Sequence, residues 1–256
     1  GYAIRLMHMF SDFCIGIFGT TIFPVFSALA ASQQKELFAR NFSLAFQSVS
    51  LMMTFAAALV IALALPIVKL ILERGAFTPE DSLLTAQLIV FYIIAYAAQT
   101  MQIVVVRGFH AHGNTRTPVI ATVIAVAVAI VADFLLVGLM GIHGLALATT
   151  IGYSLNLCLT YLLFKRHLKS KDSFTNIKIF IVGLLLSILI GFGVYYGWSA
   201  IEEQFPITNL MIKVITIMLL CLGALAVYIF ILHVLKIPTL KYIREKLQAK
   251  RTTRID

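Results

Sequence analysis

Seven long apolar segments dominate this sequence, and each is long enough to cross a lipid bilayer as a helix. About 20 predominantly apolar residues span the hydrocarbon core. The segments cover residues 4–30, 45–72, 83–106, 118–140, 143–164, 177–200 and 210–235. They show no strand-like alternation, so we predict an all-α polytopic membrane protein with about seven transmembrane helices. Pro24 and Pro66 lie inside two segments and should bend or interrupt those helices.

Composition supports this class and excludes several others. Hydrophobic residues make up 61% of the chain and charged residues 12%, whereas soluble domains have roughly 45–50% and about 25%. The three cysteines lie in different apolar segments without a CxxC pair, which is typical of small buried side chains. The chain begins at Gly1 and not at a methionine, directly before an apolar segment. We therefore expect it to be a piece of a longer protein.

Basic residues gather in alternate connections between the apolar segments. They are Lys35 and Arg40, then Arg107 and Arg116, then Lys165, Arg166, Lys169, Lys171 and Lys178, and finally seven residues within 236–256. By the positive-inside rule these connections and the C-terminus are cytoplasmic, and the first helix begins outside. The net charge of +9 therefore indicates orientation and contact with anionic lipids, and we expect no nucleic-acid partner.

Arg5, His8 and Asp12 lie on one stripe of the first predicted helix, at positions i, i+3 and i+7. An arginine inside a bilayer costs several kcal/mol unless it faces a partner or a wet cavity. We therefore predict that these three residues line a polar, substrate-binding cavity. Two simpler interpretations remain open: Arg5 neutralises Asp12, or its side chain extends to the nearer membrane surface.

A second polar pair lies deep in the fourth and fifth segments. Asp133 precedes Gly141 by eight residues and Thr149 follows it by eight, so a tight helical hairpin would bring both to similar depth, about 12 Å from the turn. Carboxylate and hydroxyl oxygens suit a sodium ion or a proton-coupled site, and we predict such a coupling site at Asp133 and Thr149. The alternative is a protonated Asp133 bonded to a neighbouring helix, with Thr149 bonded to its own backbone.

The remaining polar residues carry weaker signals. Gln99, Gln102 and Asn156 are expected to form hydrogen bonds between helices. His110 and His112 lack a third ligand, so we expect a solvated loop there and not a metal centre. The sequence contains no nucleophile–base set or phosphate-binding loop, and we predict no enzymatic activity and no organic cofactor.

Four stretches, in order, resemble the MurJ (MviN) family of lipid II flippases, within the MOP transporter superfamily. They are Tyr2-Ala3-x-Arg5-Leu6 with Gly19-Thr20 and Pro24-x-x-Ser27; Glu73-Arg74-Gly75-Ala76-Phe77-Thr78-x-x-Asp81; Arg107 to Pro118; and Gly144-Leu-Ala-Leu-Ala-Thr149. The resemblance covers residues 1 to about 165, and the last two segments match in number and hydrophobicity. His8, Phe10 and Asp12 depart from the residues usual in the family.

The resemblance implies a partial two-lobed transporter corresponding to helices 8–14 of a fourteen-helix fold. Residues 1–165 would form most of the C-terminal lobe, 166–235 two accessory helices, and 236–256 a basic cytoplasmic tail. The missing N-terminal lobe would be the partner across a central cavity. It also implies that Arg5 faces this cavity and engages a lipid-linked pyrophosphate, which a guanidinium fork suits.

The implied function is to flip lipid II, the undecaprenyl-pyrophosphate-linked peptidoglycan precursor, across the bacterial inner membrane by alternating access. The nearest alternative is another MOP exporter that moves polyprenyl-linked glycans or drugs in exchange for a cation. The other alternative is a transport-dead scaffold for cell-wall synthesis. The intramembrane charges of Arg5 and Asp133 argue against a scaffold, which has no need of them.

Overall fold

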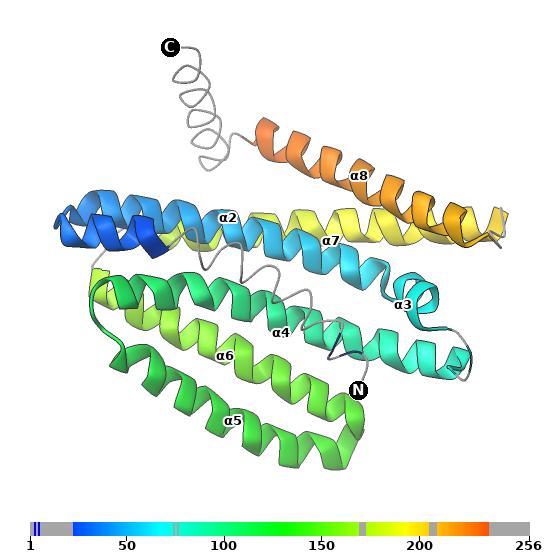
Figure 1. Ribbon diagram of the computed structural model, residues 1–256, viewed down its shortest axis with the longest axis horizontal. Coiled ribbons are helices and arrows are strands. Elements are labelled where there is room, and N and C mark those ends of the chain that lie inside the picture. The colour runs from blue at the N-terminus through cyan, green and yellow to red at the C-terminus, as the bar shows by residue number, and fades with distance from the viewer. Residues whose placement is uncertain are drawn as a thin grey trace.

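The computed structural model of this chain is built of antiparallel helices (Figure 1). It describes residues 3, 5, 23–73, 75, 77–168, 173–204 and 209–235, except for the side chains of residues 173 and 174. Residues 23–31 are helical. The elements that follow are α2 (Lys35–Ala62), α3 (Ala64–Leu72), α4 (Pro79–Ala111), α5 (Arg116–Met140), α6 (Ile142–Leu168), α7 (Ser173–Gln204) and α8 (Leu210–Val234).

Six of these helices, α2 and α4 to α8, are long and apolar enough to cross a membrane. The predicted all-α, polytopic class is therefore confirmed. The first predicted span, residues 4–30, falls largely outside the described residues. The predicted tail, residues 236–256, lies outside them altogether.

The helices are arranged around two central members, α2 and α4. Helix α4 packs against α2, α3 and α6, and α6 in turn packs against α5. On the other side, α7 packs along α2, and α8 packs mainly against α7 (Figure 1). The predicted lobe (residues 1–165) and the predicted accessory helices (residues 166–235) thus meet chiefly where α7 packs along α2.

The second predicted span is interrupted beside Pro66, as expected. Helix α2 ends at Ala62 and α3 begins at Ala64. The proline has no N–H to donate to the carbonyl four residues earlier. The backbone continues through hydrogen bonds from Leu63 N to Leu59 O (3.0 Å) and from Ile67 N to Leu63 O (2.9 Å).

Several helices extend beyond the predicted apolar segments. Helix α2 begins at Lys35, ten residues before its predicted span, so Lys35 and Arg40 belong to a helix and not to a loop. Phe42 of this extension is buried, and its ring lies 4.6 Å from that of Phe164 on α6. Phe109 on α4 lies 4.8 Å from the same ring. Aromatic packing between the helix ends supports these turns although their mean hydropathy is low.

Polar side chains join α7 to α2 inside the bundle. Asn176 Oδ1 accepts hydrogen bonds from Ser43 Oγ and from Gln47 Nε2 (2.8 Å for Gln47), and all three residues are buried. Further along, the Cβ of an added side chain at Gly191 would lie 3.3 Å from Ala58. Small residues of this kind let membrane helices approach closely, and amides hold them in register.

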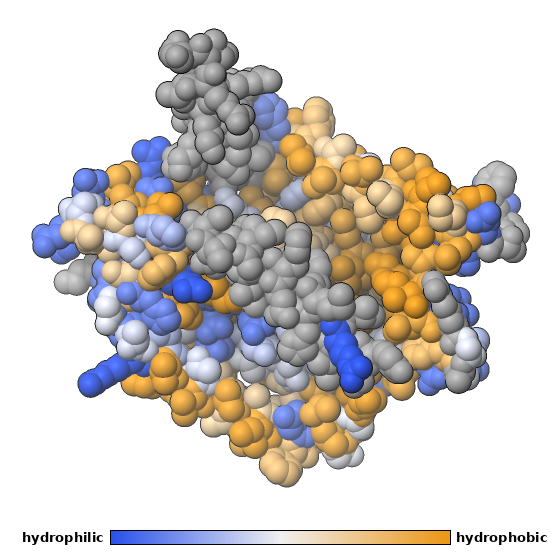
Figure 2. Space-filling model, in the orientation of Figure 1, coloured by the Kyte–Doolittle hydropathy of each residue, from blue (hydrophilic) through white to orange (hydrophobic). Residues whose placement is uncertain are grey.

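The outer helices α5 and α8 present mostly apolar side chains to their surroundings. Only 11% of the apolar window of each is buried within the protein, and Phe134 and Leu139 on α5 are more than 80% exposed. Figure 2 shows hydrophobic side chains over much of the visible surface. Apolar exposure on this scale fits a lipid environment and not water.

Candidate functional site

Arg5, the predicted cavity arginine, lies in helical backbone and its side chain is exposed. Ala3, two residues earlier, is 5% exposed and belongs to an apolar cluster with residues of α2, α3, α4 and α6. Residues two apart on a helix point to different sides. The guanidinium group therefore points away from the helices that bury Ala3. His8 and Asp12 lie outside the described residues.

The depth of Arg5 follows from the neighbours of Ala3. The apolar cluster that contains Ala3 includes Ala86 and Tyr92 of α4. These residues lie about 10 and 20 Å along α4 from its start at Pro79, at 1.5 Å per residue. Ala3 thus packs among residues within a candidate span, and not beyond its end.

The hairpin of α5 and α6 has the tight geometry that the sequence predicted. Gly141 ends α5 with φ of +56°, a conformation that glycine adopts without strain. A Cβ added at Gly144 would lie 2.1 Å from the backbone oxygen of Leu136, and one at Gly152 would lie 2.8 Å from the Cβ of Ala129. The two helices therefore approach closely at both ends of this stretch, against backbone at Gly144 and against the Ala129 side chain at Gly152.

These two contacts place Asp133 and Thr149 at about the same depth. Asp133 lies between Ala129 and Leu136 on α5, and Thr149 lies between Gly144 and Gly152 on α6. Both side chains are half-buried. The structure thus places the two residues at a similar depth, while a shared site and the binding of an ion there stay predictions.

The Asp133 carboxyl group is unusual among the described residues because its Oδ1 is buried and has no hydrogen-bond partner. A buried polar atom without a partner costs free energy, and more so when it belongs to a carboxylate. A bound cation or a proton would remove this cost. Oδ1 therefore fits the oxygen ligand that the predicted coupling site requires.

Thr149 forms the backbone contact that the alternative interpretation expected. Its Oγ1 donates to the backbone oxygen of Leu145 at 2.9 Å. This bond uses the hydroxyl proton and leaves oxygen lone pairs that can accept or coordinate. This hydrogen bond is compatible both with a coupling site and with a purely structural role of Thr149. Within the described residues, no group of three or more His, Cys, Asp or Glu side chains could hold a metal ion.

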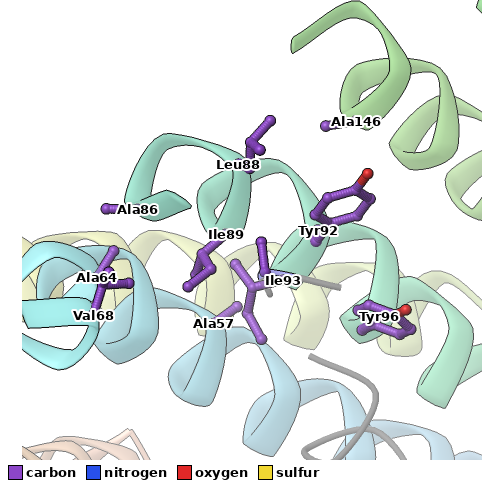
Figure 3. Packing of buried hydrophobic residues seen from close by; sticks show 11 residues of the cluster. Ala57, Ala64, Val68, Ala86, Leu88, Ile89, Tyr92, Ile93, Tyr96 and Ala146 are labelled. Atoms are coloured by element: carbon purple, nitrogen blue, oxygen red, sulfur yellow. The ribbon is translucent and has the colours of Figure 1, made fainter. Parts of the chain in front are cut away.

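Two residues near this site were not singled out from the sequence. Tyr92 of α4 is 4% exposed and lies within electrostatic range of Asp133. Figure 3 shows its hydroxyl group pointing toward the helix that carries Ala146. Thr150, next to Thr149, donates to the backbone oxygen of Phe91 at 2.9 Å and so ties α6 to α4. Only the packing of α4 on α6 brings Tyr92 to the hairpin.

The other polar candidates have mainly structural contacts. Asn156 donates to Thr122 Oγ1 at 3.2 Å and joins α6 to α5, as predicted. The solvated-loop prediction is wrong for His110, which lies in the last turn of α4. His112 ends that helix, and its ring meets the ring of Phe38 edge-on, with centroids 4.4 Å apart.

Comparisons with known proteins agree with the arrangement of the helices. A family model described as lipid II flippase MurJ matches residues 1–233. Among curated proteins, the probable lipid II flippase MurJ of Thermotoga maritima is 32% identical over 151 residues, which is 59% of this chain and 32% of that protein. The lipid II flippase MurJ of Thermosipho africanus is 31% identical over 157 residues, or 55% of this chain and 33% of that protein.

Other matches cover more of this chain. The probable lipid II flippase MurJ of Bdellovibrio bacteriovorus is 23% identical over 248 residues, which is 96% of this chain and 46% of that protein. A solved structure of a lipid II flippase MurJ in an inward closed conformation has a TM-score of 0.64 and 22% identity, and covers 89% of this chain and 46% of that one. This likeness shows a shared fold. The chain spans between a third and a half of the length of these proteins.

Proposed function

The chain belongs to the family of the lipid II flippase MurJ, a family of transporters and not of enzymes, and we propose that it forms the C-terminal part of such a flippase. The proposed substrate is lipid II, moved across the bacterial inner membrane by alternating access. Residues 1–165 would contribute most of the C-terminal lobe of the transporter and residues 166–235 its accessory helices. The opposite lobe would face the side of the bundle to which Arg5 points.

The exposed position of Arg5 is the observation that carries this proposal. Its neighbour Ala3 is buried in a cluster that includes residues of the candidate spans α2, α4 and α6 together with residues of α3, while Arg5 itself is exposed. A cation within a membrane span is costly unless it faces a partner or a water-filled cavity. The guanidinium group can bind a diphosphate through two parallel hydrogen bonds, which suits the pyrophosphate of a polyprenyl-linked substrate.

In the proposed transport step, the protein binds the head group and the membrane holds the lipid tail. Arg5 would neutralise part of the pyrophosphate charge while the head group crosses the interior of the bilayer. The two lobes would open the site first to one side and then to the other. No covalent bond changes, which agrees with the predicted lack of catalytic residues.

We further propose that Asp133 is a coupling site, because its buried Oδ1 has no partner among the described residues. A sodium ion bound there would neutralise the carboxylate and use Thr149 Oγ1 as a second oxygen ligand. The tight α5–α6 contact at Gly144 and Gly152 holds the two residues at one depth. Closure of the site would then depend on the charge state of Asp133.

Complementation tests the proposed function directly. Bacteria depleted of their own lipid II flippase would receive the intact gene that encodes this chain, and lipid II accessible at the outer leaflet would be measured. We expect rescue by the wild type, none by Arg5→Ala, and weak rescue by Arg5→Lys, because an ammonium group lacks the planar fork.

Lys213→Ala provides the matched control, because it also removes one basic side chain but lies at the start of accessory helix α8. It should rescue as the wild type does. Membrane insertion of every variant would be verified by immunoblotting of membrane fractions. Full rescue by an inserted Arg5→Ala protein would contradict the proposed role of the arginine, and failure of the wild type to bind lipid II after purification would contradict the substrate.

A further inference from the structure

A largely apolar cavity of about 760 Å³ lies between four helices, and neither Arg5 nor Asp133 lines it. Its floor is formed by α2 and α4, which pack against each other, and its walls by α6, which packs on α4, and α7, which packs on α2. We refer to it as the α6–α7 trough. Its volume falls in the range of pockets that bind small molecules, roughly 300–1,000 Å³.

The trough exists because small side chains occupy its floor. Ala57 and Ala58 of α2 and Ala97 and Ala98 of α4 line it, where larger residues would fill the space between the helices. Ala97 and Ala98 lie near the middle of the candidate span of α4, and Ala57 and Ala58 lie in the last two turns of the candidate span of α2. An apolar volume inside a candidate span offers water few hydrogen-bonding partners and suits hydrocarbon chains.

The trough extends along most of one membrane helix. On α7 its lining residues run from Phe180 to Tyr195, about 22 Å at 1.5 Å per residue. This is more than half of the hydrocarbon core, which is about 30 Å thick. Such an elongated shape fits a single hydrocarbon chain lying along the helices.

Basic side chains lie at one end of both walls. Lys165 follows the lining residue Ser154 by eleven residues, or three turns, so both lie on the same face of α6. On α7, Lys178 lies two residues before the lining residue Phe180, at the same end of the trough but on another side of the helix. Both lysines are exposed. Their long side chains can place the ammonium groups at the membrane surface above the trough.

We propose that the α6–α7 trough binds one anionic glycerophospholipid, with an acyl chain in the cavity and the phosphate group near Lys165 and Lys178. The positive-inside rule assigns this end to the cytoplasm, where anionic lipids are abundant. The charge at the rim favours an anionic over a zwitterionic head group. The bound lipid would fill the space between the lobe helices α4 and α6 and the accessory helix α7.

Native mass spectrometry of the intact protein in detergent provides the test, with phosphatidylglycerol and phosphatidylcholine of identical acyl chains as probes. We expect one tightly retained phosphatidylglycerol that Ser154→Phe removes, because the ring would enter the trough. Leu162→Phe adds the same ring at an exposed, non-lining position of α6 and should retain the lipid. Equal retention by Ser154→Phe and the wild type would overturn the proposed site.

The lysines are tested in the same assay. Lys165→Gln/Lys178→Gln should reduce the preference for phosphatidylglycerol by about five-fold for each lysine, since each contributes about 1 kcal/mol near an anionic surface. Lys69→Gln/Lys213→Gln removes two charges from α3 and α8, neither of which lines the trough, and should leave the preference unchanged. No preference in the wild type, or no loss in the first variant, would overturn the assignment of an anionic head group.

Two further measurements identify the occupant independently of these variants. A phosphatidylglycerol with a photoreactive group in its acyl chain should label peptides that contain residues 154–157 and 180–195 of the wild type. Labelling confined to other helices would overturn the proposal. An equimolar amount of undecaprenyl phosphate should not displace the bound lipid; displacement would assign the trough to a polyprenyl chain instead.

Discussion

The hydroxyl group of Tyr228 on α8 donates a hydrogen bond of 2.9 Å to the backbone oxygen of Leu51 on α2, across 177 positions of the sequence. The Tyr228 ring also stacks on Phe55, with centroids 4.4 Å apart. Tyr228 is buried, while most of the apolar span of α8 is exposed. One residue therefore supplies both a polar and an aromatic contact between the last helix and the centre of the bundle.

We expect Tyr228→Phe to weaken the attachment of α8 without changing the fold. The substitution keeps the stacked ring and removes one hydrogen bond, which in a membrane protein contributes about 0.6 kcal/mol on average and up to about 1.7. The melting temperature in detergent should fall by a small but measurable amount. Tyr196→Phe is the control, because Tyr196 is 66% exposed. An equal effect of both substitutions would argue against a specific role for the bond to Leu51.

Gly144→Ala should disrupt the α5–α6 hairpin. An added Cβ would lie 2.1 Å from the backbone oxygen of Leu136, and backbone atoms cannot move aside as a flexible side chain can. Overpacking typically costs about 1–3 kcal/mol, so we expect a clear loss of thermal stability. Gly138→Ala, on the same hairpin, has no atom within 4 Å of the new Cβ and should be tolerated. If both variants melt alike, the close approach is not a constraint.

Asn176→Ala should destabilise the contact between α7 and α2. It removes the buried oxygen that accepts from both Ser43 and Gln47, and each hydrogen bond lost costs about 0.5–1.5 kcal/mol. Proteolysis of the α6–α7 connection and thermal melting would measure the loss. Asn209→Ala alters an exposed helix cap that lies outside the contact between α7 and α2, and it serves as the control. If Asn176→Ala resists proteolysis and heat as well as the wild type does, apolar packing alone holds α7 in place.

Asp133→Asn should abolish stabilisation of the protein by sodium. A ligand that binds only the folded state at one hundred times its dissociation constant adds about 2.7 kcal/mol to the free energy of unfolding. We therefore expect the wild type to melt at a higher temperature in sodium chloride than in choline chloride of the same concentration, and Asp133→Asn to melt alike in both.

Asp81→Asn provides the matched control for the sodium experiment. Asp81 belongs to the capping box of α4, where its carboxylate accepts from the backbone N–H of Thr78 at 3.0 Å. Its substitution should lower stability equally in both salts and leave the sodium-dependent difference intact. Absence of that difference in the wild type would contradict a sodium site at Asp133.

The membrane spans were predictable because a long apolar segment in lipid has few alternatives to a helix. Their ends were less predictable. Lys35 and Arg40 were assigned to a loop, yet both belong to α2, because Phe38 and Phe42 of the same turns pack inside the bundle. A mean hydropathy over such amphipathic turns is low because it averages the apolar and polar faces. It contains no information about the other helix that buries the apolar face. Aromatic partners such as Phe164 come from helices more than 100 residues away.

The candidate site was predictable only where it depends on spacing along the sequence. The symmetric spacing of Asp133 and Thr149 about Gly141 predicted their common depth, since a tight hairpin relates sequence distance directly to depth. Tyr92 was not predicted, because it reaches the site only through the packing of α4 on α6. Nor could the sequence show that Asp133 Oδ1 lacks a hydrogen-bond partner among the described residues, which depends on the neighbouring side chains.

The sequence by itself thus determined that this protein is helical and lies in a membrane, which charges lie within its spans, and which family it resembles. These properties depend on local hydropathy, on charge and on short motifs. The tertiary structure decided that α7 lies along α2, that Asn176 meets Ser43 and Gln47, and that four helices enclose the α6–α7 trough. Such features arise from contacts between helices far apart in the chain, where the shape of small side chains, and not their hydropathy, selects the neighbour.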